Sequence, residues 1–168
     1  AGDVDSGDIV TFAATTLPSW LTFDAATGVL SGTPTNNDVG NHSVVLKATD
    51  AASKADTQSF TIAVTNTNDA PIITSSAPLK VTKGKAYNYT LSVSDVDIGD
   101  QLTITPTTLP NWLSFDPGTR TLSGTPSGSN LGSSDVVIEV SDGMLSTSQN
   151  FTVQVNNSIG SLVVLVDQ

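Results

Sequence analysis

Short segments of alternating apolar and polar residues dominate the chain. This pattern predicts strands at residues 43–48, 59–64, 72–75, 87–94, 102–105, 112–115, 121–124, 135–141 and 149–155. Clusters of Gly, Asn, Asp and Pro separate the segments, and no segment shows the 3.6-residue apolar period of a helix. Short strands at regular spacing, with turn residues between them, predict an all-β chain built as a β-sandwich.

The chain repeats itself with an offset of 92 residues. The segment LPSWLTFD at 17–24 returns as LPNWLSFD at 109–116, and LSGTP at 30–34 returns at 122–126. Residues 3–50 align with residues 95–142 without a gap, with 24 identities in 48 positions. Self-similarity of this length is typical of tandem modules, so fold and function are best interpreted module by module.

The repeat predicts a partial module over residues 1–69, a complete module over 70–157 and an extra apolar strand within 158–168. The first module lacks a counterpart of residues 71–94, which is its N-terminal two strands, so we expect the chain to be part of a longer protein. Two interpretations of residues 161–166 remain open. They begin a further module, or they or a strand from another molecule complete the first module, by strand exchange or in a homodimer.

Composition narrows the classes of function. The 168 residues carry a net charge of −10, and 15 of the 16 acidic residues are Asp. An acidic chain repels phosphate backbones, so nucleic acid is not an expected partner, and no apolar run is long enough to predict a membrane span. The absence of cysteine excludes disulfides and thiolate chemistry, and it favours an exported bacterial protein located outside the cell or at its surface.

The motifs of the second module occur in an order that resembles a known family. They are GKAYNY at 84–89, VSDVDIGDQL at 93–102, the two repeated motifs, and VSDG at 140–143. Together they resemble the dystroglycan-type cadherin-like domain, which is similar to the immunoglobulin-like repeats of bacterial surface proteins. The resemblance implies seven-stranded Greek-key sandwiches strung end to end, with neighbouring modules of the same polypeptide as partners.

Clusters of Asp follow two of the predicted strands. Asp95, Asp97 and Asp100 come directly after the strand that ends at Ser94, and Asp142 ends another strand predicted to reach the same pole of the sandwich. The copies in the first module are Asp3, Asp5, Asp8 and Asp50. Ca²⁺ takes 6–8 oxygen ligands from flexible Asp-rich loops, so the clusters predict calcium sites. Ordinary turn formation by Asp is the alternative.

The linker at residues 66–71 (NTNDAP) resembles cadherin linkers, in which Asn and Asp bridge calcium between consecutive domains. The resemblance implies one interdomain site that contains Asn66, Asn68, Asp69, Asp95, Asp97 and Asp142. Asp100 either joins this site or caps the turn at Gly99. The first-module copies would face a preceding module.

Each repeated motif contains one tryptophan. Strand alternation places Leu21 and Phe23 on one face and Trp20 on the wetter face, and the second copy does the same with Trp112. An exposed indole could stack on a sugar ring, which makes both residues candidates for carbohydrate binding. Packing beneath a neighbouring loop is the alternative, and the recurrence of Trp within a fold motif favours packing.

No arrangement of residues predicts catalysis. Asp24 and Asp116 are 92 positions apart in separate modules and are expected to form Asx turns. The single histidine, His42, becomes Ser134 in the other copy and is interpreted as a solvated loop residue. We therefore expect a non-enzymatic protein.

The sequence predicts a calcium-stiffened extracellular spacer or adhesion module of a large surface or secreted protein. The first alternative is a non-catalytic carbohydrate-binding module with a polysaccharide partner. The second is a strand-accepting module for protein interaction. Three lysines near a predicted hairpin are interpreted as a guard against edge-strand aggregation: Lys80, Lys83 and Lys85.

Overall fold

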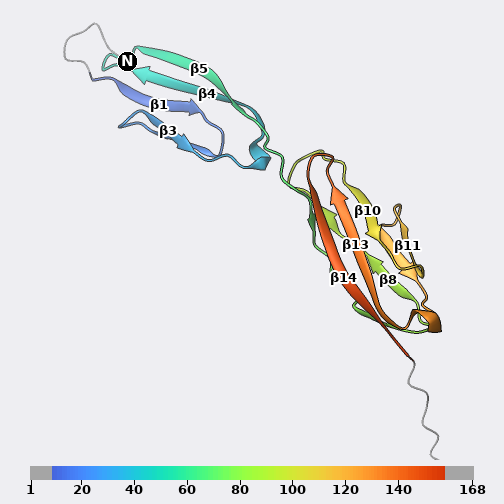
Figure 1. The fold of residues 1–168 in the computed structure, drawn as a ribbon. Helices are drawn as coiled ribbons and strands as arrows, with labels where there is room; N and C mark the ends of the chain where they lie inside the picture. The colour runs from blue at the N-terminus through green and yellow to red at the C-terminus, as the bar shows by residue number, and fades with distance from the viewer. Residues whose placement is uncertain (1–8, 158–168) are drawn as a thin grey trace, which may run out of the picture. The chain divides into compact units, whose positions relative to one another are not determined.

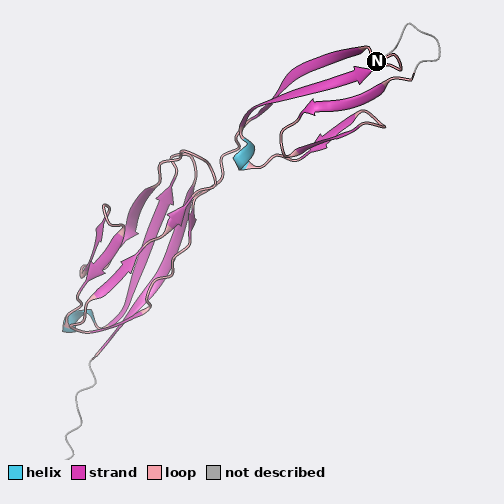
Figure 2. Cartoon of the chain, turned by 180° about the vertical axis from the view of Figure 1, so that it is seen from behind, coloured by secondary structure: helices cyan, strands magenta, loops and turns pink. Residues whose placement is uncertain are grey.

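The computed structural model describes residues 9–157, and the chain divides into two compact units between Thr67 and Asn68. Apart from two 3₁₀ turns, all the regular structure of these residues is β (Figures 1 and 2). No helix within residues 9–157 has the length and apolar character that a membrane span requires. The predicted all-β class is therefore confirmed.

Residues 9–67 of the first unit form five strands and one 3₁₀ turn. They are β1 (Thr11–Thr16), β2 (Leu21–Asp24), β3 (Val29–Gly32), the turn η1 (Asn36–Asp38), β4 (Gly40–Thr49) and β5 (Ala55–Val64). A three-stranded antiparallel sheet has the order β1-β4-β5, and β2 and β3 form a separate antiparallel hairpin (Figure 1).

The second unit repeats this arrangement and adds strands to both sheets. Its elements are β6 (Ile72–Ile73), β7 (Lys80–Thr82), β8 (Tyr87–Thr90), β9 (Val93–Ser94), β10 (Thr103–Thr108), β11 (Leu113–Asp116), β12 (Thr121–Gly124), η2 (Gly128–Asn130), β13 (Gly132–Ser141) and β14 (Ser146–Asn156). The sheets have the orders β10-β13-β14-β7, β11-β12-β8 and β6-β9. Only β7, which runs parallel to β14, departs from antiparallel pairing.

Alternating side chains from the sheets of the second unit form its core. Tyr87 and Tyr89 in β8 are buried while their neighbours are exposed, and Val136, Ile138 and Val140 in β13 follow the same period. Period-two burial arises because successive side chains of a strand point to opposite faces. The predicted β-sandwich is therefore confirmed.

The two repeated motifs lie against each other in each unit. The hairpin β11–β12 pairs Leu113 with Gly124, and a Cβ atom on Gly124 would lie 1.9 Å from the carbonyl oxygen of Trp112. In the first unit, a Cβ on Gly32 would lie 2.1 Å from the carbonyl oxygen of Trp20. Only glycine fits such a close backbone approach, so the LPxW and LSGTP motifs form one packing unit.

Two details of the second unit differ from the sequence expectation. Strand β7 was not predicted, since three residues are too few to show alternation. The strand predicted at 87–94 is interrupted and forms β8 and β9, which belong to different sheets. The predicted strand at 161–166 lies outside the described residues.

Candidate metal site

The loop that follows β9 brings three carboxylates together. One oxygen each of Asp95, Asp97 and Asp100 lies within 4.8 Å of the other two. Gly99 adopts φ +101° in this loop, a left-handed conformation that favours glycine and that lets the chain turn back towards Asp95. Three negative charges at this separation repel one another, and a divalent cation between them would turn the repulsion into attraction.

Asp95 presents one oxygen that the protein itself does not satisfy. Its Oδ1 accepts a hydrogen bond from the Asp97 backbone N–H at 3.0 Å, which forms an Asx turn. Its Oδ2 is buried and has no hydrogen-bond partner. A buried carboxylate oxygen without a partner is costly, because it has lost water and gained nothing in return. The donor set, which consists of hard carboxylate oxygens, fits Ca²⁺.

Asp97 ties the start of the second unit to this loop. The side chain is only 5% exposed, and its Oδ2 accepts a hydrogen bond from the Asp69 backbone N–H at 2.7 Å. Asp69 belongs to the linker sequence, so the segment that enters the second unit is fastened at the carboxylate cluster.

Asp142 has a different role from the three clustered residues. Its Oδ1 accepts from the backbone N–H groups of Met144 and Leu145 at 2.6 and 2.7 Å, which organises the β13–β14 turn. Its Oδ2 accepts from Asn68 Nδ2 at 2.9 Å, and the same amide donates to the Asp69 carbonyl at 3.2 Å. Asp142 therefore holds the linker residue Asn68 beside the site.

The carboxylates differ in their electrostatic surroundings. The pKa of Asp142 is lowered, first by the backbone hydrogen bonds from Leu145 and Met144 and then by the Asn68 amide. The pKa of Asp100 is raised, first by desolvation and then by the charges of Asp95, Asp97 and Asp142. Asp100 therefore lies in the electric field of three other carboxylates.

The other predicted ligands belong to the first unit. Asp50 accepts a hydrogen bond from the Lys54 backbone N–H at 2.7 Å, so it organises its turn as Asp142 does. Asn66 is exposed at the end of the first unit. Asp3, Asp5 and Asp8 lie outside the described residues.

Trp112 is packed rather than exposed to solvent. Its ring meets Tyr87 edge-on with centroids 5.8 Å apart, it packs against the core, and its indole Nε1 donates to Ser134 Oγ at 3.2 Å. The expected wetter face is therefore wrong for this residue. Trp112 precedes β11, which begins at Leu113, so strand alternation does not govern its direction. This packing favours the structural role for Trp112 over sugar stacking.

The counterpart of Trp112 in the first unit is packed differently. Trp20 meets His42 edge-on with centroids 5.6 Å apart, and its Nε1 is buried without a hydrogen-bond partner. His42 lies within β4, and its Nε2 donates to the Asp38 carbonyl at 2.5 Å. The interpretation of His42 as a solvated loop residue is therefore wrong. The 92-residue offset matches Trp20 and His42 to Trp112 and Ser134, so the same two positions are in contact in both units.

The Asx turns expected at Asp24 and Asp116 are confirmed. Asp24 Oδ1 accepts from the Ala26 N–H at 2.9 Å, and Asp116 Oδ1 accepts from the Gly118 N–H at 2.9 Å. Thr119 also donates its hydroxyl to Asp116 at 2.9 Å. Both carboxylates are used in turns, which accounts for them without catalysis.

A protein-family comparison matches most of the chain. The family is described as "Putative Ig domain", and its model matches residues 1–65 and 70–156. The chain belongs to this family. Each match covers one copy of the repeat, so the chain carries two Ig-like domains in tandem.

Three similar proteins set this assignment in context. The chain is 37% identical over 139 residues to the "Serine-rich adhesin for platelets" of Staphylococcus aureus strain MRSA252, which covers 79% of this chain and 10% of the adhesin. The chain thus spans about a tenth of that relative. The structure of protocadherin PcdhgB3 EC1-4 matches with a TM-score of 0.59 at 16% identity, over 89% of this chain and 41% of that one. This likeness shows a cadherin-like sandwich fold.

A third match is a structure of the endo-fucoidan hydrolase MfFcnA4. It is 31% identical and covers 91% of this chain and 24% of the hydrolase, with a TM-score of 0.46.

Proposed function

We propose that the chain is a calcium-stiffened spacer and adhesion segment of a large extracellular protein. The observation that supports this most strongly is the cluster of three carboxylates next to the linker, with the Asp95 Oδ2 atom buried and unpaired. Family membership and the similarity to a surface adhesin support an extracellular adhesion-type module. The finer resemblance to dystroglycan-type cadherin-like domains remains part of the proposal.

Calcium would bind at the cluster of Asp95, Asp97 and Asp100. The backbone carbonyl groups of the loop and water would complete the coordination, because Ca²⁺ takes more oxygens than three carboxylates supply. Asn68 and Asp69, which are already fastened beside the site, would be held more firmly once the ion neutralises the cluster.

Stiffening would follow from this neutralisation. Asn66 would add a ligand from the far side of the linker, and calcium would restrict the segment between Asn66 and Asp69. In a protein with many modules, a restricted linker at each junction keeps a distal adhesive region away from the cell surface.

Calorimetric titration of the metal-free chain with CaCl₂ tests the binding step. We expect binding to the wild-type chain and at least tenfold weaker binding to Asp95→Asn and Asp97→Asn. The matched control is Glu139→Gln, which removes one charge from the same unit within strand β13. Unchanged affinity in both Asp variants, or equal weakening in the control, would contradict the site.

Small-angle scattering tests the stiffening step separately. With calcium, we expect the maximum dimension to settle at one value, whereas EDTA should give a broader distribution. Asn66→Ala should reduce this calcium effect while leaving most of the affinity, because Asn66 is the ligand proposed for this site from the first unit. A distribution that calcium does not change would remove the stiffening role but leave the binding site intact.

A further inference from the structure

One turn of the second unit joins an aspartate to a proline. Strand β11 ends at Asp116, and Pro117 begins the turn that leads to β12. This is the only Asp–Pro bond in the sequence. The proline nitrogen belongs to a tertiary amide and becomes a basic secondary amine when it leaves. In acid, such a nitrogen takes up a proton and leaves more readily than the nitrogen of an ordinary peptide bond.

The Asp116 carboxylate is held beside this bond. Its Oδ1 accepts a hydrogen bond from the Gly118 N–H at 2.9 Å, and its Oδ2 accepts one from the Thr119 hydroxyl at 2.9 Å. The ring that Oδ1 closes with Gly118 contains the Asp116 carbonyl carbon and the Pro117 nitrogen. A carboxylate has about four lone-pair sites, so these two bonds leave others free. The carboxylate is therefore restrained next to the bond and is still a nucleophile.

The surroundings keep this carboxylate ionised in mild acid. The pKa of Asp116 is lowered, first by the Thr119 hydroxyl and then by the backbone hydrogen bond of the turn. Thr121 and Thr90, which lie beside Asp116 across the sheet, are neutral, and Arg120 is the charged residue of the turn. The turn is exposed, so water reaches the bond. The carboxylate therefore remains ionised at a pH at which an ordinary Asp is protonated.

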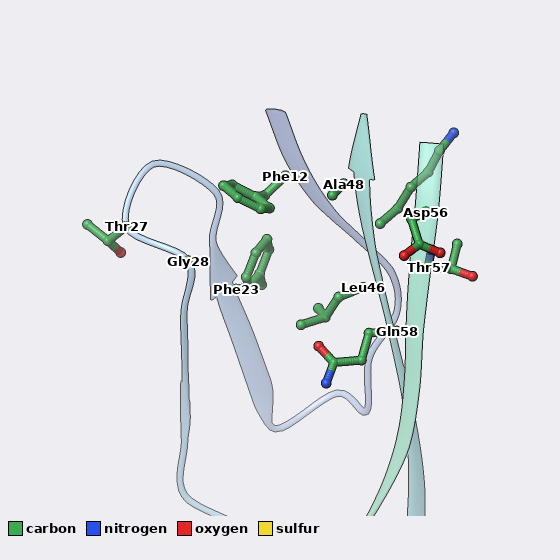
Figure 3. Close-up of a pocket in the computed structure, with 10 residues that line it drawn as sticks. Phe12, Phe23, Thr27, Gly28, Leu46, Ala48, Asp56, Thr57 and Gln58 are labelled. Atoms are coloured by element: carbon green, nitrogen blue, oxygen red, sulfur yellow. The ribbon is translucent and has the colours of Figure 1, made fainter. Parts of the chain in front are cut away.

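The first unit holds an aspartate in a similar way without the proline. Asp24 Oδ1 accepts from the Ala26 N–H at 2.9 Å, and the pKa of Asp24 is lowered first by the Thr27 side chain. Figure 3 shows Thr27 in this turn, between β2 and β3. Ala25 stands where the second unit has Pro117. The two turns therefore place a carboxylate alike but differ in the nitrogen that would leave.

We propose that the β11–β12 turn is a self-cleavage site, at which the Asp116 carboxylate breaks its own peptide bond to Pro117 in mild acid. One carboxylate oxygen attacks the Asp116 carbonyl carbon, and a cyclic anhydride forms. The bond from this carbon to the Pro117 nitrogen breaks, and solvent protonates the nitrogen as it leaves. Water then opens the anhydride to two carboxyl groups, so the reaction consumes one water. It happens once in each chain and is not an enzymatic turnover.

The fold would hold the two pieces together after cleavage. Strand β12, which follows the cut, pairs with β8 and β11, which precede it. Likewise, β13 pairs with β10, and β14 pairs with β7. Both larger sheets of the second unit are therefore shared between the pieces, and cleavage leaves a folded module without a continuous chain. In the spacer role proposed above, such a module would be the point at which tension separates the protein, whereas the cleavage itself does not depend on calcium or on that role.

Incubation of the intact chain at about pH 4, near the ordinary pKa of Asp, tests the reaction. Mass spectrometry after denaturation should show fragments 1–116 and 117–168, whose summed mass exceeds that of the intact chain by one water. Size exclusion without denaturant should show one species. Pro117→Ala and Asp116→Asn should each slow cleavage at least tenfold. Absence of the fragments, or equal cleavage of Pro117→Ala, would overturn the proposal.

The first unit allows the reaction to be transferred. Ala25→Pro should create a second cleavage, directly after Asp24, because a carboxylate is already held there and the other copy accepts proline at this position. Circular dichroism checks that this variant is folded. A folded Ala25→Pro chain that is cut only after Asp116 would contradict the roles assigned to the carboxylate and to the proline.

Two further comparisons separate the contribution of the turn from the ordinary acid sensitivity of an Asp–Pro bond. A synthetic peptide of residues 111–122 lacks the fold that restrains the carboxylate, so it should be cut at least threefold more slowly than the intact chain. Thr119→Val removes the hydrogen bond that lowers the pKa of Asp116 most, so it should slow cleavage more at about pH 3 than at about pH 5. Thr119→Ser should restore the wild-type profile. Equal rates for peptide and chain would overturn the proposal and assign the cleavage to the dipeptide alone.

Discussion

At the scale of single residues, the close backbone approach at Gly124 of the LSGTP motif leaves no room for a side chain. Gly124→Ala places a Cβ atom 1.9 Å from the Trp112 carbonyl oxygen, so the hairpin must separate. We expect the free energy of unfolding to fall by about 3 kcal/mol. Gly128→Ala is the matched control, because its nearest neighbour is the flexible Lys83 Cδ at 3.7 Å. Urea unfolding followed by Trp112 fluorescence, in a Trp20→Phe background, measures both. Equal stability of the two variants would contradict the close-approach argument.

The two buried tyrosines of β8 should respond differently to loss of their hydroxyl groups. The Tyr89 hydroxyl bonds to the half-buried Ser75 and Gln149, so Tyr89→Phe removes both interactions and should cost about 1–3 kcal/mol. The Tyr87 hydroxyl is buried without a partner, so Tyr87→Phe should be neutral or stabilising. The same urea experiment tests both variants. A larger loss at Tyr87 than at Tyr89 would be the contrary result.

Tyr87 also predicts a pH dependence. Burial, followed by the proximity of Tyr89, raises the pKa of Tyr87 from 10.0 to about 12. A pKa that is higher in the folded than in the unfolded state means that stability is fully present below pH 10 and declines between pH 10 and 12. Thermal unfolding between pH 9 and about 12 should therefore show a smaller alkaline loss for Tyr87→Phe than for the wild-type chain. Identical pH profiles would show that Tyr87 does not govern this loss.

At the scale of elements, calcium bound in the loop after β9 should reverse the effect of one substitution on stability. Without calcium, Asp100→Asn removes a charge repelled by Asp95 and Asp97, so the variant should be at least as stable as the wild type. With calcium in hundredfold excess over Kd, the wild type gains about 2.7 kcal/mol, and a variant that binds more weakly gains less. Melting curves in EDTA and in CaCl₂ test this reversal, with Glu139→Gln as control. The same order of stability in both buffers would argue against Asp100 as a ligand.

These elements also show how far the sequence could lead. Alternation located the long strands, and comparison of the two copies located the acidic loop. Both signals can be read from the residues themselves, without knowledge of tertiary contacts. Strand β7 was missed because its pairing with β14 is a tertiary choice that three residues cannot encode. The packing of Trp112 and the orientation of His42 were mispredicted for a similar reason. The direction of each side chain depends on where a strand starts and on which partner, Ser134 or Trp20, lies opposite.

At the scale of the whole molecule, the unequal cores predict two unfolding transitions. The second unit buries most of the described apolar core, whereas the first leaves Phe60 36% exposed. Burial of apolar area is the main source of stability, so the first unit should unfold at lower temperature. Calorimetry should resolve the two steps, and hydrogen exchange should assign the lower one to residues 9–67.

Calcium should then affect the two transitions differently. Calcium should raise the upper transition, because Asp95, Asp97 and Asp100 all belong to the second unit. Asp95→Asn should abolish this calcium effect, whereas Glu139→Gln, which removes a charge from strand β13, should retain it. A single cooperative transition, or a calcium response confined to the lower step, would contradict this division of stability between the two modules.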